Sequence, residues 1–371
     1  MVINYSKQNI NQDDIDAVIE VLKSDFLTQG PKVPEFENAL RDYCSVKFVK
    51  VVSNATAALH LAYLAIGLKQ GDIVWTTPNT YVATANAALY CGAEVDFVDI
   101  DARTYNMSIL SLEEKLKQAK KEKKLPKLVV PVHFSGQSCE MKDIWELSKE
   151  YGFKVIEDAS HALGGEYLGK KVGCCEYSHI ALFSFHPVKM ITTGEGGAIV
   201  TNDKELDEKV SLLRSHGITK DENKFLNESH GKWYYEQHSL GYNYRLTEMQ
   251  AALGISQLKR LDSFVEKRRE IANFYLSNLK GLVLPFQHPD THSSWHLFVI
   301  QTKNRRKVFQ QLIEEGIQTQ VHYIPVNSQP FYDRERLNNS EYLYRNCLSL
   351  PIYVDLTDDE LEKVVNNLRH D

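Results

Sequence analysis

Short apolar runs alternate with helical segments over the first two-thirds of this chain, and this alternation restricts its fold most. The runs 48–53, 72–77 and 127–134 are rich in valine and other strand-forming residues, and helical patterns follow at 55–68 and 141–152. This order predicts βαβ units, in which helices cover both faces of a parallel sheet. We therefore expect an α/β fold with a mainly parallel sheet, whose ligands gather at the carboxyl ends of the strands.

The alternation of short apolar runs with helical segments ends near residue 244. Apolar side chains keep mostly helical spacing over residues 244–279, and Thr247 and Gln250 have the spacing of a capping box at the start of this stretch. We expect one long helix here, followed by a strand at 295–302. The rest of the sequence is expected to be α+β, unlike the regular βαβ alternation of the first part.

Two domains follow from this change. The large domain takes residues 1–250, including an N-terminal arm, and a smaller α+β domain takes residues 251–371. The smaller domain is expected to contain helices near 305–315 and 358–369.

Composition excludes several classes of protein. The 371 residues carry a net charge of -6 with a pI near 6.1, which disfavours general binding to nucleic acid or to anionic membranes. No apolar run reaches the roughly 18 residues that span a bilayer, and residues 1–14 lack the apolar core of a secretory signal. The six cysteines are scattered without a CxxC pair. We expect a cytoplasmic protein with free thiols and no metal site.

The familiar nucleotide and hydrolase motifs are absent. The sequence has no GxGxxG, GxxxxGK[ST], HExxH or GxSxG. Nicotinamide dehydrogenases, P-loop enzymes, zincins and α/β-hydrolases are therefore disfavoured.

Two features near the first strands suit a phosphate and a planar ring. In "SNAT" (53–56) a helix opens directly after a strand, and the N–H groups of a helix N-terminus and the Thr56 hydroxyl can bind phosphate. Tyr81 follows the second strand and can stack on a ring. Each feature has an ordinary alternative, a plain helix cap for the first and a core aromatic for the second.

Asp158 ends the strand 153–158, and a carboxylate at that buried place needs a partner. A protonated pyridine nitrogen would hold it ionised, and His161 would lie close enough to bond a ring oxygen. A helix-capping aspartate with a structural histidine explains the same residues equally well.

Lys189 follows the strand 179–185, which contains Ser184, and precedes the glycines of "TGEGG" (193–197). A lysine in a desolvated pocket has a lowered pKa and becomes a Schiff-base nucleophile. A single loop lysine is more often solvated. Phosphate donors, a stacking ring, an aspartate and a lysine on successive strand ends are, however, the four parts that pyridoxal phosphate requires.

At this point the chain resembles the fold-type-I, pyridoxal-phosphate-dependent nucleotide-sugar aminotransferases of the DegT type. The resemblance covers nearly the whole chain and is carried by "SNATAAL" (53–59), "TTPNTYVATANAAL" (76–89), "EDASHALG" (157–164), "FSFHPVKMITTGEGGAIVTND" (183–203), "GYNYRLTEMQAALG" (241–254) and "VHYIPV" (321–326). It implies that Lys189 forms the Schiff base and moves protons, and that pyridoxamine phosphate forms as an intermediate.

The resemblance also assigns the remaining cofactor contacts. Asp158 would pair with the pyridine nitrogen, His161 would contact the ring oxygen, and Tyr81 would stack on the ring. Ala55, Thr56 and Ser184 would hold the phosphate. Asn243 would reach the phosphate of the other subunit's cofactor, so the active unit is expected to be a homodimer.

The substrate contacts implied by the family lie in three places. They are Tyr5, the segment Asp25, Phe26, Leu27 and Thr28, and the segment Gln320, Val321, His322 and Tyr323. The chain departs from the family pattern at two positions. Ala55, a phosphate contact, stands where many relatives have glycine, and Asn327, near the sugar contacts, replaces a histidine common in HYxPxH segments.

Within the family, the chain looks most like the branch of the pseudaminic acid pathway. That branch transfers an amino group from L-glutamate to C4 of a UDP-linked 4-keto-6-deoxy-N-acetylhexosamine, giving UDP-4-amino-4,6-dideoxy-N-acetyl-β-L-altrosamine. Alternatives are an aminotransferase for UDP-4-amino-arabinose or for a dTDP- or GDP-4-amino-6-deoxyhexose, and a non-catalytic regulator that binds the cofactor. A sugar 3-dehydratase is disfavoured, because that branch has histidine where Lys189 stands.

Overall fold

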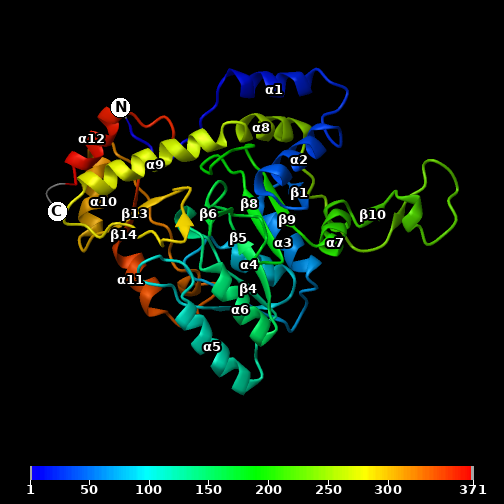
Figure 1. Ribbon diagram of the computed structural model, residues 1–371, viewed down its shortest axis with the longest axis horizontal. Helices are drawn as coiled ribbons and strands as arrows, with labels where there is room; N and C mark the ends of the chain where they lie inside the picture. The colour runs from blue at the N-terminus through cyan, green and yellow to red at the C-terminus, as the bar shows by residue number, and fades with distance from the viewer. Residues whose placement is uncertain (1, 369–371) are drawn as a thin grey trace.

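A seven-stranded sheet forms the centre of the structure, a computed structural model that describes residues 2–368. Its strand order is β1-β9-β8-β5-β4-β2-β3. Figure 1 labels β1, β4, β5, β8 and β9 of this sheet. β9 runs antiparallel to both of its neighbours, and the other pairs are parallel. The predicted mainly parallel α/β sheet is confirmed. The strands are β1 (Phe48–Val52), β2 (Ile73–Thr76), β3 (Glu94–Phe97), β4 (Leu128–Val130), β5 (Lys154–Asp158), β8 (Ile180–Ser184) and β9 (Gly197–Thr201).

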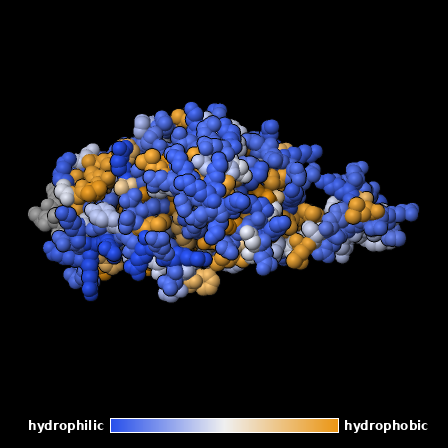
Figure 2. Space-filling view, turned by 90° about the horizontal axis from the view of Figure 1, so that it is seen from below, coloured by the Kyte–Doolittle hydropathy of each residue, from blue (hydrophilic) through white to orange (hydrophobic). Residues whose placement is uncertain are grey.

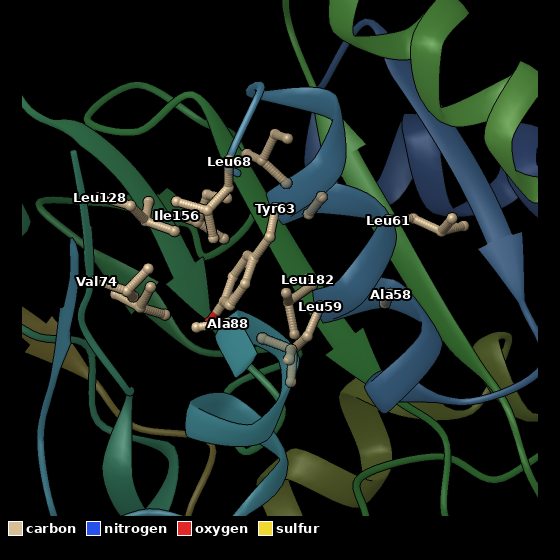
Figure 3. Packing of buried hydrophobic residues seen from close by; sticks show 14 of the residues in the cluster. Ala58, Leu59, Leu61, Tyr63, Leu68, Val74, Ala88, Leu128, Ile156 and Leu182 are labelled. Atoms are coloured by element: carbon tan, nitrogen blue, oxygen red, sulfur yellow. The ribbon is translucent and has the colours of Figure 1, made fainter. Parts of the chain in front are cut away.

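Helices cover both faces of the sheet, because apolar residues alternate to both sides along each strand. Val74, Ile156 and Leu182 face one core, and their chain neighbours Trp75, Val155 and Phe183 face the cores on the other side. Figure 3 shows the first core, where side chains of α3 pack on the sheet. The helices on this face are α3 (Ala55–Ala65), α4 (Ala83–Tyr90) and α7 (Lys204–Arg214), and those on the other are α2 (Lys32–Cys44), α5 (Ile109–Glu122), α6 (Met141–Tyr151) and α8 (Glu248–Leu258).

The expected long helix over 244–279 is wrong in one respect, because it is divided into α8 and α9 (Leu261–Asn278). The capping box of Thr247 and Gln250 is present at the start of α8. At the break, the N–H of Arg260 donates to the carbonyl of Gln257 in a tighter turn, and the Arg260 side chain pairs with the buried Asp14. This contact with the N-terminal helix α1 (Gln12–Leu22) favours the break over a continuous helix.

The C-terminal part has a core of its own beside the sheet. α9 runs into it from α8 (Figure 1), and β13 pairs antiparallel with β14. The predicted division into 1–250 and 251–371 stays a prediction; its boundary falls inside α8, and residue 369 of the predicted last helix lies outside the described residues. The elements that follow α9 are β13 (Phe298–Gln301), α10 (Arg305–Glu314), α11 (Asn338–Asn346), β14 (Cys347–Leu350) and α12 (Asp358–Asn366).

Arg268 of α9 links this helix to two other segments of the same C-terminal part. Its buried Nη1 donates to the carbonyl oxygens of Trp295, His296 and Ile352 at 3.3, 3.3 and 2.9 Å. Burial lowers the pKa of Arg268 to about 10, so the group stays charged at neutral pH.

Replacing Arg268 by leucine is expected to lower the free energy of unfolding by about 3 kcal/mol, because three buried carbonyls lose their donor. The urea midpoint of the variant measures this loss. Lys267→Leu, at a partly exposed position of the same helix where the lysine pairs with the exposed Glu270, is the matched control and is expected to change the midpoint little. A midpoint for Arg268→Leu equal to that of the control would contradict the expectation.

A segment around residues 217–240 projects from the body of the molecule (Figure 1). It contains the short pair β10 (Ile218–Thr219) and β11 (Glu236–Gln237). Figure 2 shows a hydrophobic patch on this mostly hydrophilic projection. Leu226, Trp233 and Leu240 are more than three-quarters exposed, at 81%, 76% and 78%. A further small sheet consists of β6 (Glu166–Tyr167), β7 (Lys170–Lys171) and β12 (Thr291–His292).

Candidate active site

A cavity of about 750 Å³ lies at the carboxyl ends of β5 and β8, with walls from both the sheet and the C-terminal part. Most of the predicted site residues line it. They are Tyr5, Ala55, Thr56, Tyr81, Asp158, His161, Ser184, Lys189, His322 and Tyr323. Segments far apart in the sequence therefore meet in one place.

The other predicted site residues do not line this cavity. Asn243 and residues 25–28 are exposed on the surface, and Gln320 and Val321 lie beside His322 but outside the cavity wall. Asn327, the departure noted in the sequence, is fully buried, and its Nδ2 donates to the carbonyl of Glu335 at 2.6 Å.

The N-terminus of α3 forms one end of the cavity. The Asn54 side chain caps the helix by accepting from the N–H of Ala57 at 2.8 Å, so the N–H groups of Ala55 and Thr56 have no partner within the helix. Gly197 allows α3 to lie close to β9, because a Cβ at that position would be 2.9 Å from the Ala55 nitrogen. With the hydroxyls of Thr56 and Ser184, this end offers donors to an anion.

Asp158 lies on the cavity wall at the end of β5 and is only 4% exposed. Its Oδ2 accepts from the Thr84 hydroxyl at 2.7 Å, and its Oδ1 accepts from the N–H of Ser160 at 3.2 Å. The Thr84 hydroxyl also lies 2.9 Å from that of Thr80. An ionised carboxylate has about four acceptor sites, so these two bonds fix Asp158 and leave capacity for a cationic partner.

Lys189 lines the same cavity, in a turn after β8 where its N–H donates to the carbonyl of His186 at 2.8 Å. Burial lowers the pKa of Lys189 to about 8, and the charge of Asp158 opposes this shift. Roughly a fifth of the amine is therefore neutral near pH 7.4, far more than for an ordinary lysine, and a nucleophile or general base requires this neutral form.

His161 is held in one tautomer. Its Nδ1 accepts from the N–H of Ser135 at 3.3 Å, so Nε2 carries the proton and lies 3.1 Å from the Tyr323 hydroxyl. Burial, and then the charge of Lys189, lower the pKa of His161 well below its usual value, so the ring is neutral. Tyr81 is 63% exposed, with its ring centroid 6.5 Å from that of Tyr323, so one face is free to stack.

Comparison with known families identifies this arrangement. Residues 8–369 match the DegT/DnrJ/EryC1/StrS aminotransferase family. The chain belongs to this family.

Known proteins and solved structures agree with that assignment. The chain is 44% identical to the UDP-4-amino-4,6-dideoxy-N-acetyl-beta-L-altrosamine transaminase of Campylobacter jejuni subsp. jejuni serotype O:23/36, over 99% of this chain and 96% of the relative. It superimposes with a TM-score of 0.90 on Helicobacter pylori PseC, an aminotransferase of pseudoaminic acid biosynthesis, at 34% identity and 99% and 98% coverage. A putative sugar aminotransferase of Streptococcus pneumoniae, Spr1654, matches in its PLP form with a TM-score of 0.89, at 26% identity and 100% and 98% coverage.

The predicted enzyme class and fold class are confirmed: the chain is an aminotransferase of the sugar-modifying kind with an α/β fold. Pyridoxal phosphate is the cofactor of this family, and Spr1654 has been solved in both its PLP and PMP forms. A sugar and an amino donor are therefore its substrates. Within residues 2–368, no helix has the length and apolar character needed to cross a bilayer.

The donor set of this aminotransferase fits pyridoxal phosphate. The free N–H groups of α3 with Thr56 and Ser184 suit the phosphate, and Asp158 keeps acceptor capacity for the ring nitrogen. Lys189 lies on the same wall with a lowered pKa, as Schiff-base chemistry requires.

Sequence reasoning missed several residues that line the cavity. Thr84 bonds Asp158 directly, and Ser160, His186, Glu195 and His296 also line the wall. Thr84 follows Thr80 by four residues, a spacing that could have drawn attention to it. His296 stands within the apolar run "WHLFVI" and reads as a core residue, so its sequence context carries no signal of a site.

The lowered pKa of Lys189 predicts how the cofactor-free enzyme reacts with amine reagents. Only the neutral amine reacts, so labelling of Lys189 by trinitrobenzenesulfonate should rise with pH through a midpoint near 8 rather than 10.5. Peptide mapping measures the rate at this site. In urea-unfolded protein the same lysine should regain the ordinary midpoint, and equal midpoints in both states would contradict the prediction.

Proposed function

We propose that this aminotransferase transfers an amino group from L-glutamate to C4 of a UDP-linked 4-keto-6-deoxy-N-acetylhexosamine, giving UDP-4-amino-4,6-dideoxy-N-acetyl-β-L-altrosamine. The observation that carries this proposal is 44% identity, over 99% of the chain, to a transaminase named for that product. The resemblance to PseC over 99% of the chain supports the same pathway.

The proposed roles of the site residues follow from their chemistry. Ala55, Thr56 and Ser184 bind the phosphate, and Tyr81 covers one face of the ring. Asp158, fixed by Thr84 and Ser160, holds the proton on the ring nitrogen, so that the bound cofactor withdraws electrons from the substrate carbon. His161 donates its Nε2 proton to the ring oxygen.

Lys189 is the group that moves protons in both halves of the reaction. In the first half its neutral amine would take the proton from Cα of glutamate and pass it to the cofactor carbon that receives the amino group. In the second half it would take a proton from that carbon and deliver it to C4 of the sugar. The lowered pKa of Lys189 keeps the amine available for the first transfer.

A homodimer is part of this proposal. Asn243 is exposed outside its own cavity, and the projecting segment around 217–240 carries Leu226, Trp233 and Leu240 on its surface. A second copy would cover these apolar side chains, and its cofactor phosphate would accept from Asn243. Residues 25–28, which are also exposed, would then face the sugar nucleotide across the interface, with Tyr5 and Gln320 to Tyr323 facing it within one chain.

The proposal is tested with the purified enzyme loaded with pyridoxamine phosphate. Adding the UDP-linked 4-keto-L-sugar should restore the absorption band of the lysine-bound cofactor within seconds. The control substrates are a dTDP- and a GDP-linked 4-keto-6-deoxyhexose and the UDP-4-keto-pentose that leads to 4-amino-arabinose. A response to one of these alone would transfer the activity to that sugar, and no response to any would favour a non-catalytic protein that binds the cofactor.

A further inference from the structure

His296 is a buried histidine on the C-terminal wall of the cavity, and the proposed roles above leave it unused. It is only 2% exposed, and its ring centroid lies 4.4 Å from that of His161. Its backbone is fixed by Arg268, whose Nη1 donates to the His296 carbonyl at 3.3 Å. The imidazole therefore has a set position before any ligand enters.

The two ring nitrogens of His296 differ in their surroundings. Nδ1 is fully enclosed and has no hydrogen-bond partner. Nε2 also has no partner among the described residues but is not enclosed in this way, so it faces the cavity that the residue lines. Burial, and then the neighbouring His161 and Lys189, lower the pKa of His296 well below its usual value, so the ring is neutral and carries one proton.

That proton belongs on the nitrogen that faces the cavity. Orphaned N–H groups are rarer in protein interiors than acceptors without a partner. The enclosed Nδ1 is thus the bare nitrogen, and Nε2–H points into the site. The corresponding nitrogen of His161 lies 3.1 Å from the Tyr323 hydroxyl and its proton is assigned above to the ring oxygen of the cofactor, so His296 is the histidine of this pair with a free donor.

Besides the donors assigned to the cofactor phosphate, the cavity wall has three other histidines, His60, His186 and His322. His322 Nδ1 lies 2.8 Å from the Ser349 hydroxyl, and His60 Nδ1 lies 3.3 Å from the Tyr244 hydroxyl. Among the described residues of the chain, the lining includes one lysine, Lys189, and no arginine, whereas Asp158 and Glu195 add negative charge. Lys189 takes part in covalent and proton-transfer chemistry. A carboxylate of the amino donor therefore needs a further N–H donor within the site.

We propose that His296 binds a carboxylate of the amino donor through its Nε2–H. The inference rests on the proposed function, because it assumes that an amino acid such as L-glutamate enters this cavity. A neutral donor suits a site that two substrates occupy in turn: it bonds a carboxylate in one half-reaction and leaves no buried charge unpaired when the sugar replaces it. His296 is then a binding residue for the amino donor.

Three substitutions of His296 distinguish a hydrogen bond donated by Nε2 from a role of the ring in packing. Glutamine places an amide N–H near the position of Nε2, asparagine places one near Nδ1, and phenylalanine keeps only the ring shape. Binding of glutarate, an unreactive dicarboxylate, to the cofactor-loaded enzyme is measured by titration calorimetry. His296→Asn and His296→Phe are expected to weaken glutarate binding about ten-fold or more, and His296→Gln to stay within about three-fold of the parent enzyme.

Several results would overturn the inference. These are a His296→Phe variant that binds glutarate like the parent enzyme, equal weakening in all three variants, and loss of the cofactor absorption in all three. The proposed function is judged separately, by whether L-glutamate converts the pyridoxal form of the unmodified enzyme to the pyridoxamine form. If it is converted and His296→Phe keeps its affinity for glutarate, then only the role of His296 fails. An unmodified enzyme that L-glutamate does not convert would overturn both.

Discussion

Replacing Lys189 by arginine is expected to lower turnover by at least about 10³-fold. Arginine keeps a positive charge at this wall of the cavity, but its guanidinium stays protonated and forms no Schiff base. The loss therefore reports the covalent and proton-transfer roles rather than charge alone. The lowered pKa of about 8 makes Lys189 suited to both roles, and no other lysine lines the cavity of the described chain.

The measurement is the rate of conversion of the pyridoxal form by L-glutamate, followed by absorption in a stopped-flow instrument. Lys204→Arg, on the exposed first turn of α7, is the matched control and should react like the parent enzyme. Mass spectrometry after borohydride reduction should find the cofactor on the peptide that contains Lys189. Turnover by Lys189→Arg within ten-fold of the parent enzyme would show that the lysine is not the reacting group.

Replacing Asp158 by asparagine is expected to lower turnover by about 10²- to 10⁴-fold. Asparagine keeps the size of the side chain but removes the buried negative charge that would pair with the protonated ring nitrogen. Breaking such a buried pair costs about 3–5 kcal/mol, which corresponds to this range of rates. The affinity for pyridoxal phosphate should fall as well, because the cofactor loses its ionic partner.

A graded comparison separates the charge from its positioning. Thr84→Val removes the hydroxyl that donates to Asp158 Oδ2 at 2.7 Å and leaves the charge in place. Its turnover should fall about ten-fold, the effect of losing one hydrogen bond to a charged group. If Thr84→Val costs as much as Asp158→Asn, the threonine rather than the carboxylate charge dominates the site. If Asp158→Asn keeps full turnover, the pairing with the ring nitrogen is wrong.

The elements near the site show how far sequence patterns reach. The strands that end at Asp158 and Ser184 were expected within one residue of their observed ends, because β-branched runs bounded by polar residues have a clear signature. The break between α8 and α9 was not expected. Apolar spacing continues through residues 259 and 260, and the contact between Arg260 and Asp14, 246 residues apart in sequence, is visible only in the folded chain.

The sequence by itself determined the α/β alternation, the order of the cofactor residues along the strand ends, and the likeness to an aminotransferase family. These properties are local, since each depends on a short run of side chains with a fixed period or on a motif. The tertiary structure decided which residues share the cavity. It brought Tyr5, His296, His322 and Tyr323 to the strand ends and left Asn243 and residues 25–28 outside. Packing between distant segments sets these distances, the tautomer of His161 and the desolvation of Lys189, and no single stretch of sequence encodes them.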